Sequence, residues 1–180
     1  MLEEWGAHVD GKDPAMNDTP RTSETELREK VRELMNDTRI AMLTSVDTDG
    51  TLVSRPMGTQ EVVEDGDVWF ITSAGSDVVD ELALDSEVNV AYSGKSSWVS
   101  VSGTATVIRD VEKQKELWNT FTSAWFSGGA DDPAVRLIRV TPHTAQYWDS
   151  PGGVRTMLSM LTSAATKGTP KTGESRTVDM

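Results

Sequence analysis

Cysteine is absent from the 180-residue sequence, and histidine occurs only twice. Without a thiol, the chain cannot form a disulfide or use a thiolate as a nucleophile or metal ligand. This absence is typical of a reducing compartment, so we expect the protein to be cytoplasmic. Long apolar stretches are also lacking, since no run approaches the roughly 20 residues that span a bilayer. Residues 1–16 contain acidic side chains and no apolar core, which argues against a secretory signal.

Basic residues are scarce, with 17 lysines and arginines against 29 aspartates and glutamates, a formal net charge of −12. This balance argues against nucleic acid or an anionic membrane surface as a partner, because no basic stripe is available to replace counterions. An anionic ligand would have to be held by a few local positive groups against an unfavourable overall field.

Common catalytic and nucleotide-binding signatures are missing as well, since the chain has no GxSxG, Walker A or GxGxxG motif. The sequence "DTDG" at 47–50 has the spaced aspartates of a calcium loop but lacks the further ligands that an EF-hand requires. It joins two strand-like segments, and we interpret it as a hairpin turn. His143 follows Pro142 between two expected strands, where it is most simply a turn residue. A haem or metal role for it would need a second ligand at suitable spacing.

Three segments divide the chain by composition. A hydrophobic share of 37% and 180 residues suit one globular domain with flanking segments. We expect a loose N-terminal extension at 1–22, a domain at 23–166 and a polar C-terminal tail at 167–180. Met16 lies inside the extension, and the sequence leaves open whether it or Met1 is the original start.

The domain opens with a helix and continues mainly as strands. "SETE" at 23–26 forms a capping box, and apolar residues follow it at helical spacing, which predicts an amphipathic helix over 24–36. The apolar period then changes to two, as in strands. A majority of strands joined by tight hairpins predicts a mainly antiparallel barrel with helices outside. The expected strands are 39–46, 51–63, 68–73, 87–93, 98–108, 134–142 and 144–149, the first three forming a meander, and the further helices are 76–86, 110–125 and 154–166.

The junction "FITSAGSDVVDEL" at 70–82 has features of a phosphate site. The hydroxyls of Thr72, Ser73 and Ser76, together with N–H groups at the helix start, could hold a phosphate. Alternatively, Ser76 simply caps the helix. The first turn of that helix carries Asp77 and Asp80 and no basic residue, so positive charge would have to come from elsewhere.

"SRPM" at 54–57 is the second informative segment. Pro56 removes a backbone donor inside an otherwise good strand, which indicates a strand edge or a break in the barrel. Arg55 points to the same side as the apolar Val53 and Met57, and an arginine in such surroundings needs an anionic partner. A ligand's anion and a salt bridge to one of the many acids would both satisfy it.

Several segments taken together resemble the pyridoxamine 5'-phosphate oxidase-like superfamily, and more closely its general-stress-protein branch of FMN-binding split barrels. The resemblance runs from about residue 24 to the C-terminus, and the order and spacing of the segments carry it. It implies a six-stranded antiparallel split β-barrel that forms a homodimer with two FMN molecules at the subunit interface. The segments are "RIAMLTSVDTDGTLVSRPM", "VWFITSAGS", "VNVAYS", "WVSVSGTATVI", "LIRVTPHTAQYWDSPGG" and "TGESRTVDM".

The resemblance also implies a set of cofactor-binding residues. Arg55 would hold the FMN phosphate, and the strand from Arg55 to Gln60 would run beside the isoalloxazine ring. Apolar and aromatic walls suit the flat ring, whereas arginine, hydroxyls and helix N–H groups suit the phosphate. The implied set is Arg55, Pro56 and Met57 on that strand; Phe70, Ile71 and Thr72 along the ribityl and phosphate path, with Ser76 nearby; Trp98 at the start of its strand; and Trp148 from the other subunit.

The chain departs from the family pattern at the expected phosphate site. Asp77 and Val78 stand where flavin-binding members commonly have basic residues. Three alternatives follow: Arg55 suffices together with hydroxyls and backbone groups, Arg109 or Arg155 substitutes from elsewhere, or FMN binds weakly or not at all. Gln60 stands where the substrate-binding lysine of a true pyridoxamine phosphate oxidase would fall, which argues against that reaction.

Three functions remain compatible with these residues. The resemblance implies an FMN-dependent oxidoreductase of the general stress protein type, with NAD(P)H or a small molecule as electron donor and no catalytic side chain identified. A non-enzymatic stress protein that binds or buffers flavin is the alternative. A relative that binds deazaflavin, haem or no flavin is the third. The polar tail is expected to be disordered or laid against the dimer surface, and its family-like ending favours docking.

Overall fold

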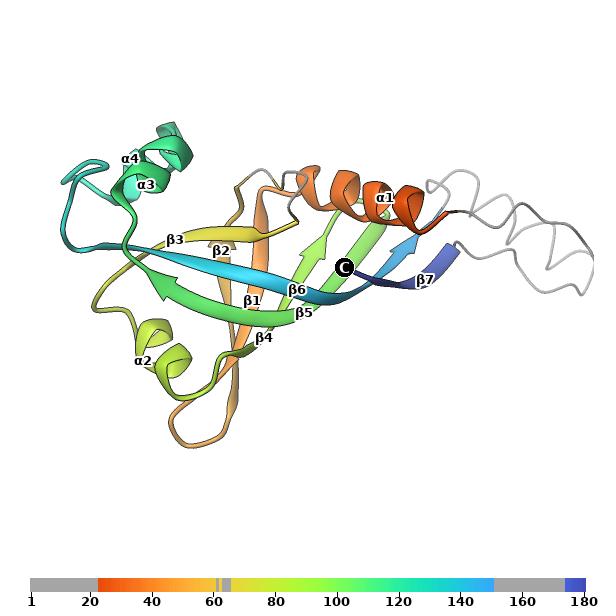
Figure 1. Cartoon of the computed structure of the whole chain (residues 1–180), viewed down its shortest axis with the longest axis horizontal. Coiled ribbons are helices and arrows are strands. Elements are labelled where there is room, and N and C mark those ends of the chain that lie inside the picture. Colours follow the sequence, from red (N-terminus) through yellow and green to blue (C-terminus); the bar gives the residue numbers. More distant parts are fainter. Residues whose placement is uncertain (1–22, 61, 63–65, 151–173) are drawn as a thin grey trace, which may run out of the picture.

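The computed structural model describes residues 23–60, 62, 66–150 and 174–180, which fold into a curved antiparallel sheet with helices on its outside (Figure 1). The fold is therefore the expected mainly β architecture with flanking helices. The elements are α1 (Glu24–Asn36), β1 (Ile40–Val46), β2 (Leu52–Gly58), β3 (Val68–Ser73), α2 (Asp77–Leu84), β4 (Glu87–Ser93), β5 (Ser97–Ile108), α3 (Val111–Leu117), α4 (Thr120–Trp125), β6 (Val135–Asp149) and β7 (Glu174–Asp179).

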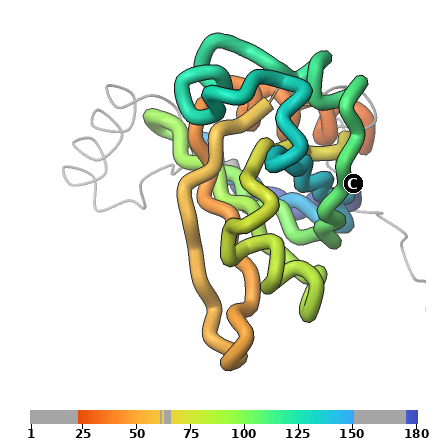
Figure 2. Tube along the Cα trace, turned by 90° about the vertical axis from the view of Figure 1, so that its left-hand side faces the viewer, coloured from red at the N-terminus to blue at the C-terminus, as the bar shows by residue number. Residues whose placement is uncertain are grey.

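Local sequence signals account for the first helix and the first hairpin. The Ser23 side chain accepts a hydrogen bond from the backbone N–H of Glu26, and the Glu26 carboxylate accepts one in return from the Ser23 N–H, as a capping box requires. At the β1–β2 turn, Gly50 adopts a φ of 87°, a left-handed conformation that side chains disfavour. The hairpin extends beyond the body of the sheet (Figure 2). The interpretation of 47–50 as a turn is confirmed.

The strand order differs from the expected meander. The described residues form a seven-stranded sheet in the order β2–β1–β4–β5–β6–β3, with β7 also paired to β6. β3 follows β2 in the chain but pairs with β6, from Val68 opposite Val140 to Ser73 opposite Val135. Alternation along a strand shows which side chains are buried but not which strand lies next to it, so the meander prediction was wrong.

A single long strand replaces the two strands expected at 134–142 and 144–149. β6 runs through both, and β5 pairs with it from Ser97 to Ile108. The register shifts where Gly103 faces Pro142 and Ser102 faces Thr144, which leaves His143 as the extra residue of a bulge. The prediction of His143 as a turn residue between two strands was therefore wrong. Its ring Nε2 lies 2.8 Å from Thr104 Oγ1 across the pair.

Part of the polar tail joins the sheet. Residues 174–179 form β7, which pairs with the second half of β6 on the edge opposite β5. Val178 is buried against the core, and the Arg28 side chain in α1 donates a hydrogen bond to the carbonyl of Asp179 at 2.8 Å. Residues 167–173 and the helix expected over 154–166 lie outside the described residues.

The helical segment after β5 is also divided. One helix was expected over 110–125, but the chain forms α3 and α4 on either side of Asn119. The Asn119 side chain accepts a hydrogen bond from the Thr122 N–H at 2.9 Å and so starts a second helix. Of the helices in the described ranges, none is long and apolar enough to cross a membrane.

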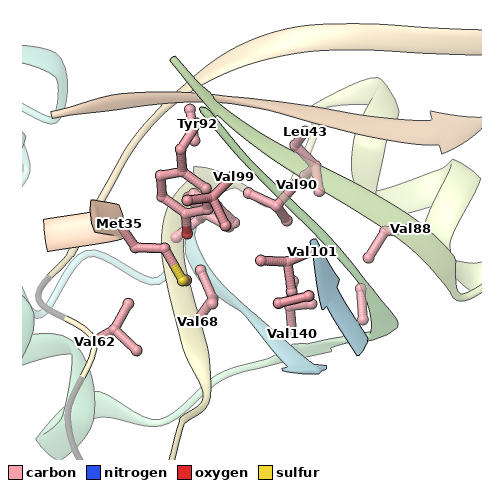
Figure 3. Packing of buried hydrophobic residues seen from close by; sticks show 14 of the residues in the cluster. Met35, Leu43, Val62, Val68, Val88, Val90, Tyr92, Val99, Val101 and Val140 are labelled. Carbon is pink, nitrogen blue, oxygen red and sulfur yellow. The ribbon is translucent and has the colours of Figure 1, made fainter. Parts of the chain in front are cut away.

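The hydrophobic core lies inside the curve of the sheet, closed at one side by α1. Figure 3 shows Met35 of α1 reaching toward Tyr92 among valines of several strands. Tyr92 is 2% exposed, and burial raises the pKa of its phenol, which therefore stays neutral. The central members are Leu43, Val68, Phe70, Val90, Val99, Val101 and Val140.

Gly103 is required where β5 meets the bulge. A methyl group at this position would collide with the Thr141 carbonyl oxygen and lie 3.0 Å from Cα of Pro142. Because backbone atoms cannot move aside as a flexible side chain can, Gly103→Ala should destabilise the fold by about 2 kcal/mol and lower Tm by about 4–8 °C. Gly75→Ala, where nothing lies within 4 Å, is the control and should melt close to wild type. Equal melting of both variants in thermal denaturation would contradict the close approach of the two strands.

Candidate functional site

A cavity of about 310 Å³ opens where the curved sheet fails to close. β2 and β3 are the two ends of the strand order, and both line this cavity rather than pairing with each other. Figure 2 shows them beside each other, β2 in orange and β3 in yellow. The volume is at the lower end of the range for small-molecule sites. The lining residues are Ile40, Pro56, Met57, Gly58, Gln60, Ile71, Thr72, Ser73, Ser76, Phe121, Thr122, Trp125 and Phe126.

One wall of the cavity is apolar and aromatic. Pro56 and Met57 come from β2, and the rings of Phe121 and Trp125 come from α4, with their centroids 6.4 Å apart. Trp125 is 74% exposed, which is unusual for the largest apolar side chain. Gly58 makes this arrangement possible, because a Cβ there would lie 2.7 Å from the Phe121 ring.

Hydroxyl groups at the end of β3 and the start of α2 form a polar part of the lining, called here the polar wall. Thr72 Oγ1 and Ser76 Oγ lie 2.9 Å apart, and the Ser76 hydroxyl donates to the Ser73 carbonyl at 2.7 Å. Ser76 occupies the N-cap position of α2, but its side chain makes no capping hydrogen bond. The alternative that Ser76 simply caps the helix therefore does not hold. Its hydroxyl bonds to Thr72 and Ser73 instead, and Ser76 is among the residues that line the cavity.

Arg55 is held by a buried carboxylate. Its Nη2 lies 2.7 Å from each carboxylate oxygen of Glu81 in α2, and its Nη1 donates to Ser45 Oγ at 2.6 Å. Ser45 in turn donates to Glu81 Oε2 at 2.6 Å, which closes a ring of three side chains. The exposed fractions of the two charged side chains are 20% for Arg55 and 4% for Glu81. The sequence left two possible partners for Arg55, the anion of a ligand and an acidic residue of the chain. The structure shows the second, a salt bridge to Glu81.

This pairing bears on the expected role of Arg55. Arg55 does not line the cavity, although its neighbour Pro56 does. A buried carboxylate left without its arginine would be strongly unfavourable, so the pair is hard to separate. That Arg55 holds a ligand phosphate stays a prediction.

The two residues that replace the family's basic side chains occupy different environments. Asp77 is exposed at the first position of α2, whereas Val78 is 2% exposed and belongs to the hydrophobic core. A basic residue at position 78 of this fold would therefore be buried in the core. Of the suggested substitutes, Arg109 is exposed at the end of β5 and does not line the cavity, and Arg155 lies outside the described residues.

The structure brings together only part of the expected site. Pro56, Met57, Ile71, Thr72 and Ser76 all line the cavity. Three aromatic residues of the expected set do not: Phe70 is fully buried in the core, and Trp98 and Trp148 face each other in the β5–β6 register, where they are 44% and 38% exposed.

Sequence reasoning missed the contribution of α4. Phe121, Thr122 and Phe126 line the cavity although they follow β2 by some sixty residues in the chain. The Asn119 side chain, which begins α4, donates a hydrogen bond to Gln60 Oε1 at 3.1 Å and so links the two elements. The cluster of aromatics at 118–126 was the one available signal, since exposed aromatics often mark binding surfaces.

Known proteins are similar to this chain in sequence and fold. Residues 26–171 match the family described as Pyridoxamine 5'-phosphate oxidase like. The chain belongs to this family. Among curated proteins, Protein bli-3 of Neurospora crassa is 30% identical over 165 residues, which covers 83% of this chain and 79% of that protein.

Solved structures of general stress proteins share the family fold. A general stress protein 26 from Jannaschia sp. CCS1 superposes with a TM-score of 0.73 at 28% identity, covering 87% of this chain and 99% of that chain. A general stress FMN/FAD binding protein from Xanthomonas citri gives a TM-score of 0.61 at 31% identity, covering 72% and 92%. The pyridoxamine 5'-phosphate oxidase-like split barrel expected from the sequence is thus confirmed, with seven strands in place of six.

The Arg55–Glu81 pair can be tested through stability. Glu81→Ala leaves the largely buried guanidinium without its carboxylate, so it should lower the free energy of unfolding by about 3 kcal/mol. Asp80→Ala removes an exposed carboxylate from the same helix and should change it by less than about 0.5 kcal/mol. Urea denaturation measures both variants. Equal losses would show that the Glu81 carboxylate has no special partner.

Proposed function

We propose that this protein binds a flavin nucleotide, FMN, in the cavity between β2 and β3 and acts as a flavin-dependent oxidoreductase. The observation that carries the proposal is the composition of that cavity, whose lining combines apolar and aromatic side chains with hydroxyl groups. Such a combination suits a flat ring that carries a polyhydroxyl chain. Membership of the family and the likeness to a general stress FMN/FAD binding protein support the same ligand.

The residues of the cavity divide naturally between the parts of a flavin. Met57, Ile71 and Phe121 offer apolar surface for the ring. Thr72 and Ser76 offer hydroxyls for the ribityl chain and its phosphate. The flavin would supply the redox chemistry, accepting a hydride or electrons from NAD(P)H or a small substrate. The protein would orient the ring and shield it from water.

A homodimer is part of the proposal. The outer face of the sheet exposes large apolar side chains on several strands, a pattern typical of a surface covered by a partner. A second copy of the chain on this face would bring Trp148 near the partner's flavin, as the family resemblance implies. The large exposed apolar residues on the strands are Ile40, Met42, Leu52, Trp98 and Trp148, of which Ile40 also lines the cavity.

One observation favours a flavin-binding protein without enzymatic activity as a second candidate. Among the described residues, no side chain that lines the cavity titrates near neutral pH. The protein would then lack a general acid or base next to the ligand. A redox reaction through the flavin alone does not need one, so both candidates stand until activity is measured.

Flavin binding can be measured by titrating the purified protein, freed of cofactor, with FMN and following flavin fluorescence. Trp125→Ala should weaken FMN binding about tenfold, because it removes an aromatic wall of the cavity. Leu84→Ala is a matched control, since Leu84 is 71% exposed, similar to Trp125 at 74%, but lies outside the cavity. Equal FMN affinity in both variants would place the ligand elsewhere.

Electron transfer separates the two candidate functions. When the FMN-loaded protein is mixed with NADH or NADPH without oxygen, the absorption of oxidised flavin should disappear faster than it does for free FMN under the same conditions. The physical reason is that a bound, oriented ring reacts with a lower entropic cost than a free one. Reduction no faster than that of free FMN would leave the non-enzymatic flavin-binding protein as the better description.

A further inference from the structure

We infer that Glu81 makes this site indifferent to the flavin phosphate, so that riboflavin and FMN bind with comparable affinity. The inference rests on the proposed function, since it concerns which flavin the cavity takes. It assigns to Glu81 a specificity-determining role that acts through Arg55. The chemical class of ligand is thereby a neutral flavin with a polyhydroxyl chain, for which a terminal phosphate is optional.

The first step concerns the donors of Arg55. Its Nη2 lies 2.7 Å from both oxygens of Glu81, and its Nη1 is bonded to Ser45. If the guanidinium turned to a ligand phosphate, the Glu81 carboxylate would stay behind with a side chain only 4% exposed and no positive partner. The loss of that pair offsets what the phosphate contact would gain. If Arg55 kept Glu81 and met a phosphate through another of its five N–H groups, the carboxylate would already neutralise its charge, so that contact would gain little.

The second step concerns other positive charge. Among the described residues, the cavity lining includes no lysine or arginine. Asp77 stands exposed beside Ser76 at the start of α2, where its carboxylate offsets the positive end of the helix dipole. A phosphate at the polar wall would therefore meet a nearby negative charge within a protein of net charge −12.

The third step concerns the groups that remain. Thr72 and Ser76 already bond to each other, and Ser76 donates to the Ser73 carbonyl. Neutral hydroxyls hydrogen-bond to the hydroxyls of a ribityl chain as well as they do to a phosphate, but they do not neutralise charge. A phosphate dianion that binds here thus loses hydration and gains no contact with a cation to compensate. The ribityl hydroxyls exchange hydrogen bonds to water for hydrogen bonds to protein hydroxyls, so their transfer costs little free energy.

The direct test compares two ligands on the unmodified protein. The full chain is titrated with riboflavin and with FMN, each at about 50 mM and about 500 mM NaCl. The two dissociation constants should agree within about threefold, and their ratio should change by less than about twofold with salt. A phosphate held by a cation would instead give tighter FMN binding that weakens as salt rises.

A pair of variants then tests the assignment to Glu81. Glu81→Gln keeps the shape and a hydrogen-bond acceptor but removes the negative charge, so Arg55 becomes available to an anion. The ratio of FMN affinity to riboflavin affinity should rise by about tenfold. Asp80→Asn makes the same change in net charge on an exposed residue of α2, and its ratio should stay within about twofold of wild type.

The outcomes separate this inference from the proposed function. Comparable binding of the two flavins, with a gain for FMN in Glu81→Gln alone, supports both. Wild-type protein that binds FMN at least about tenfold tighter than riboflavin overturns the inference and leaves the proposed function standing. If the wild type binds FMN and riboflavin comparably but Glu81→Gln shows no gain in FMN affinity, the assignment to Glu81 is overturned. Failure to bind either flavin overturns the proposed function and the inference with it. The wild-type comparison decides even where Glu81→Gln does not fold.

Discussion

Strand β6 is the constraint on which the rest of the structure depends. β5 pairs with it along one edge, while β3 and β7 divide its other edge between them. β3 pairs with β6 on one edge, and no strand of the described residues pairs with its other edge. β2, at the other end of the strand order, likewise pairs only with β1 within that part of the chain. The cavity forms between these two edges. The cavity therefore lies where it does because β3 pairs with β6 instead of with β2.

Charge in the site is arranged around a single internal pair. Arg55 lies in strand β2 and Glu81 in helix α2, 26 residues apart in the sequence. Their contact holds α2 against the sheet beside the cavity. The pair satisfies a guanidinium and a carboxylate that would each be costly to bury alone. It also leaves the polar wall with hydroxyls as its main groups, so the chemistry of the wall is that of neutral hydrogen bonding.

Local features of this fold could be predicted from sequence, and long-range pairings could not. The capping box at Ser23 and the turn at Gly50 depend on residues within one or two turns of the chain, and both were predicted. The pairing of β3 with β6 and the bulge at His143 depend on partners far along the chain, which side-chain alternation does not identify. For Arg55 the need for an anion could be predicted, but not that Glu81 would meet it. Five of the nine expected site residues line the cavity. The aromatic wall from α4 was missed because the aromatic cluster at 118–126 does not show by itself that the helix packs beside β2.

The late position of β7 has a consequence for biosynthesis. A chain emerging from the ribosome presents its N-terminal elements first, so β6 at Val135–Asp149 emerges before β7 at Glu174–Asp179. Until then, the backbone of β6 from Thr144 to Asp149 is an uncovered edge, and such an edge can pair with a strand of another molecule. Nascent chains and products cut short before residue 174 therefore share a point of attachment for aggregation, which β7 covers when it pairs with β6.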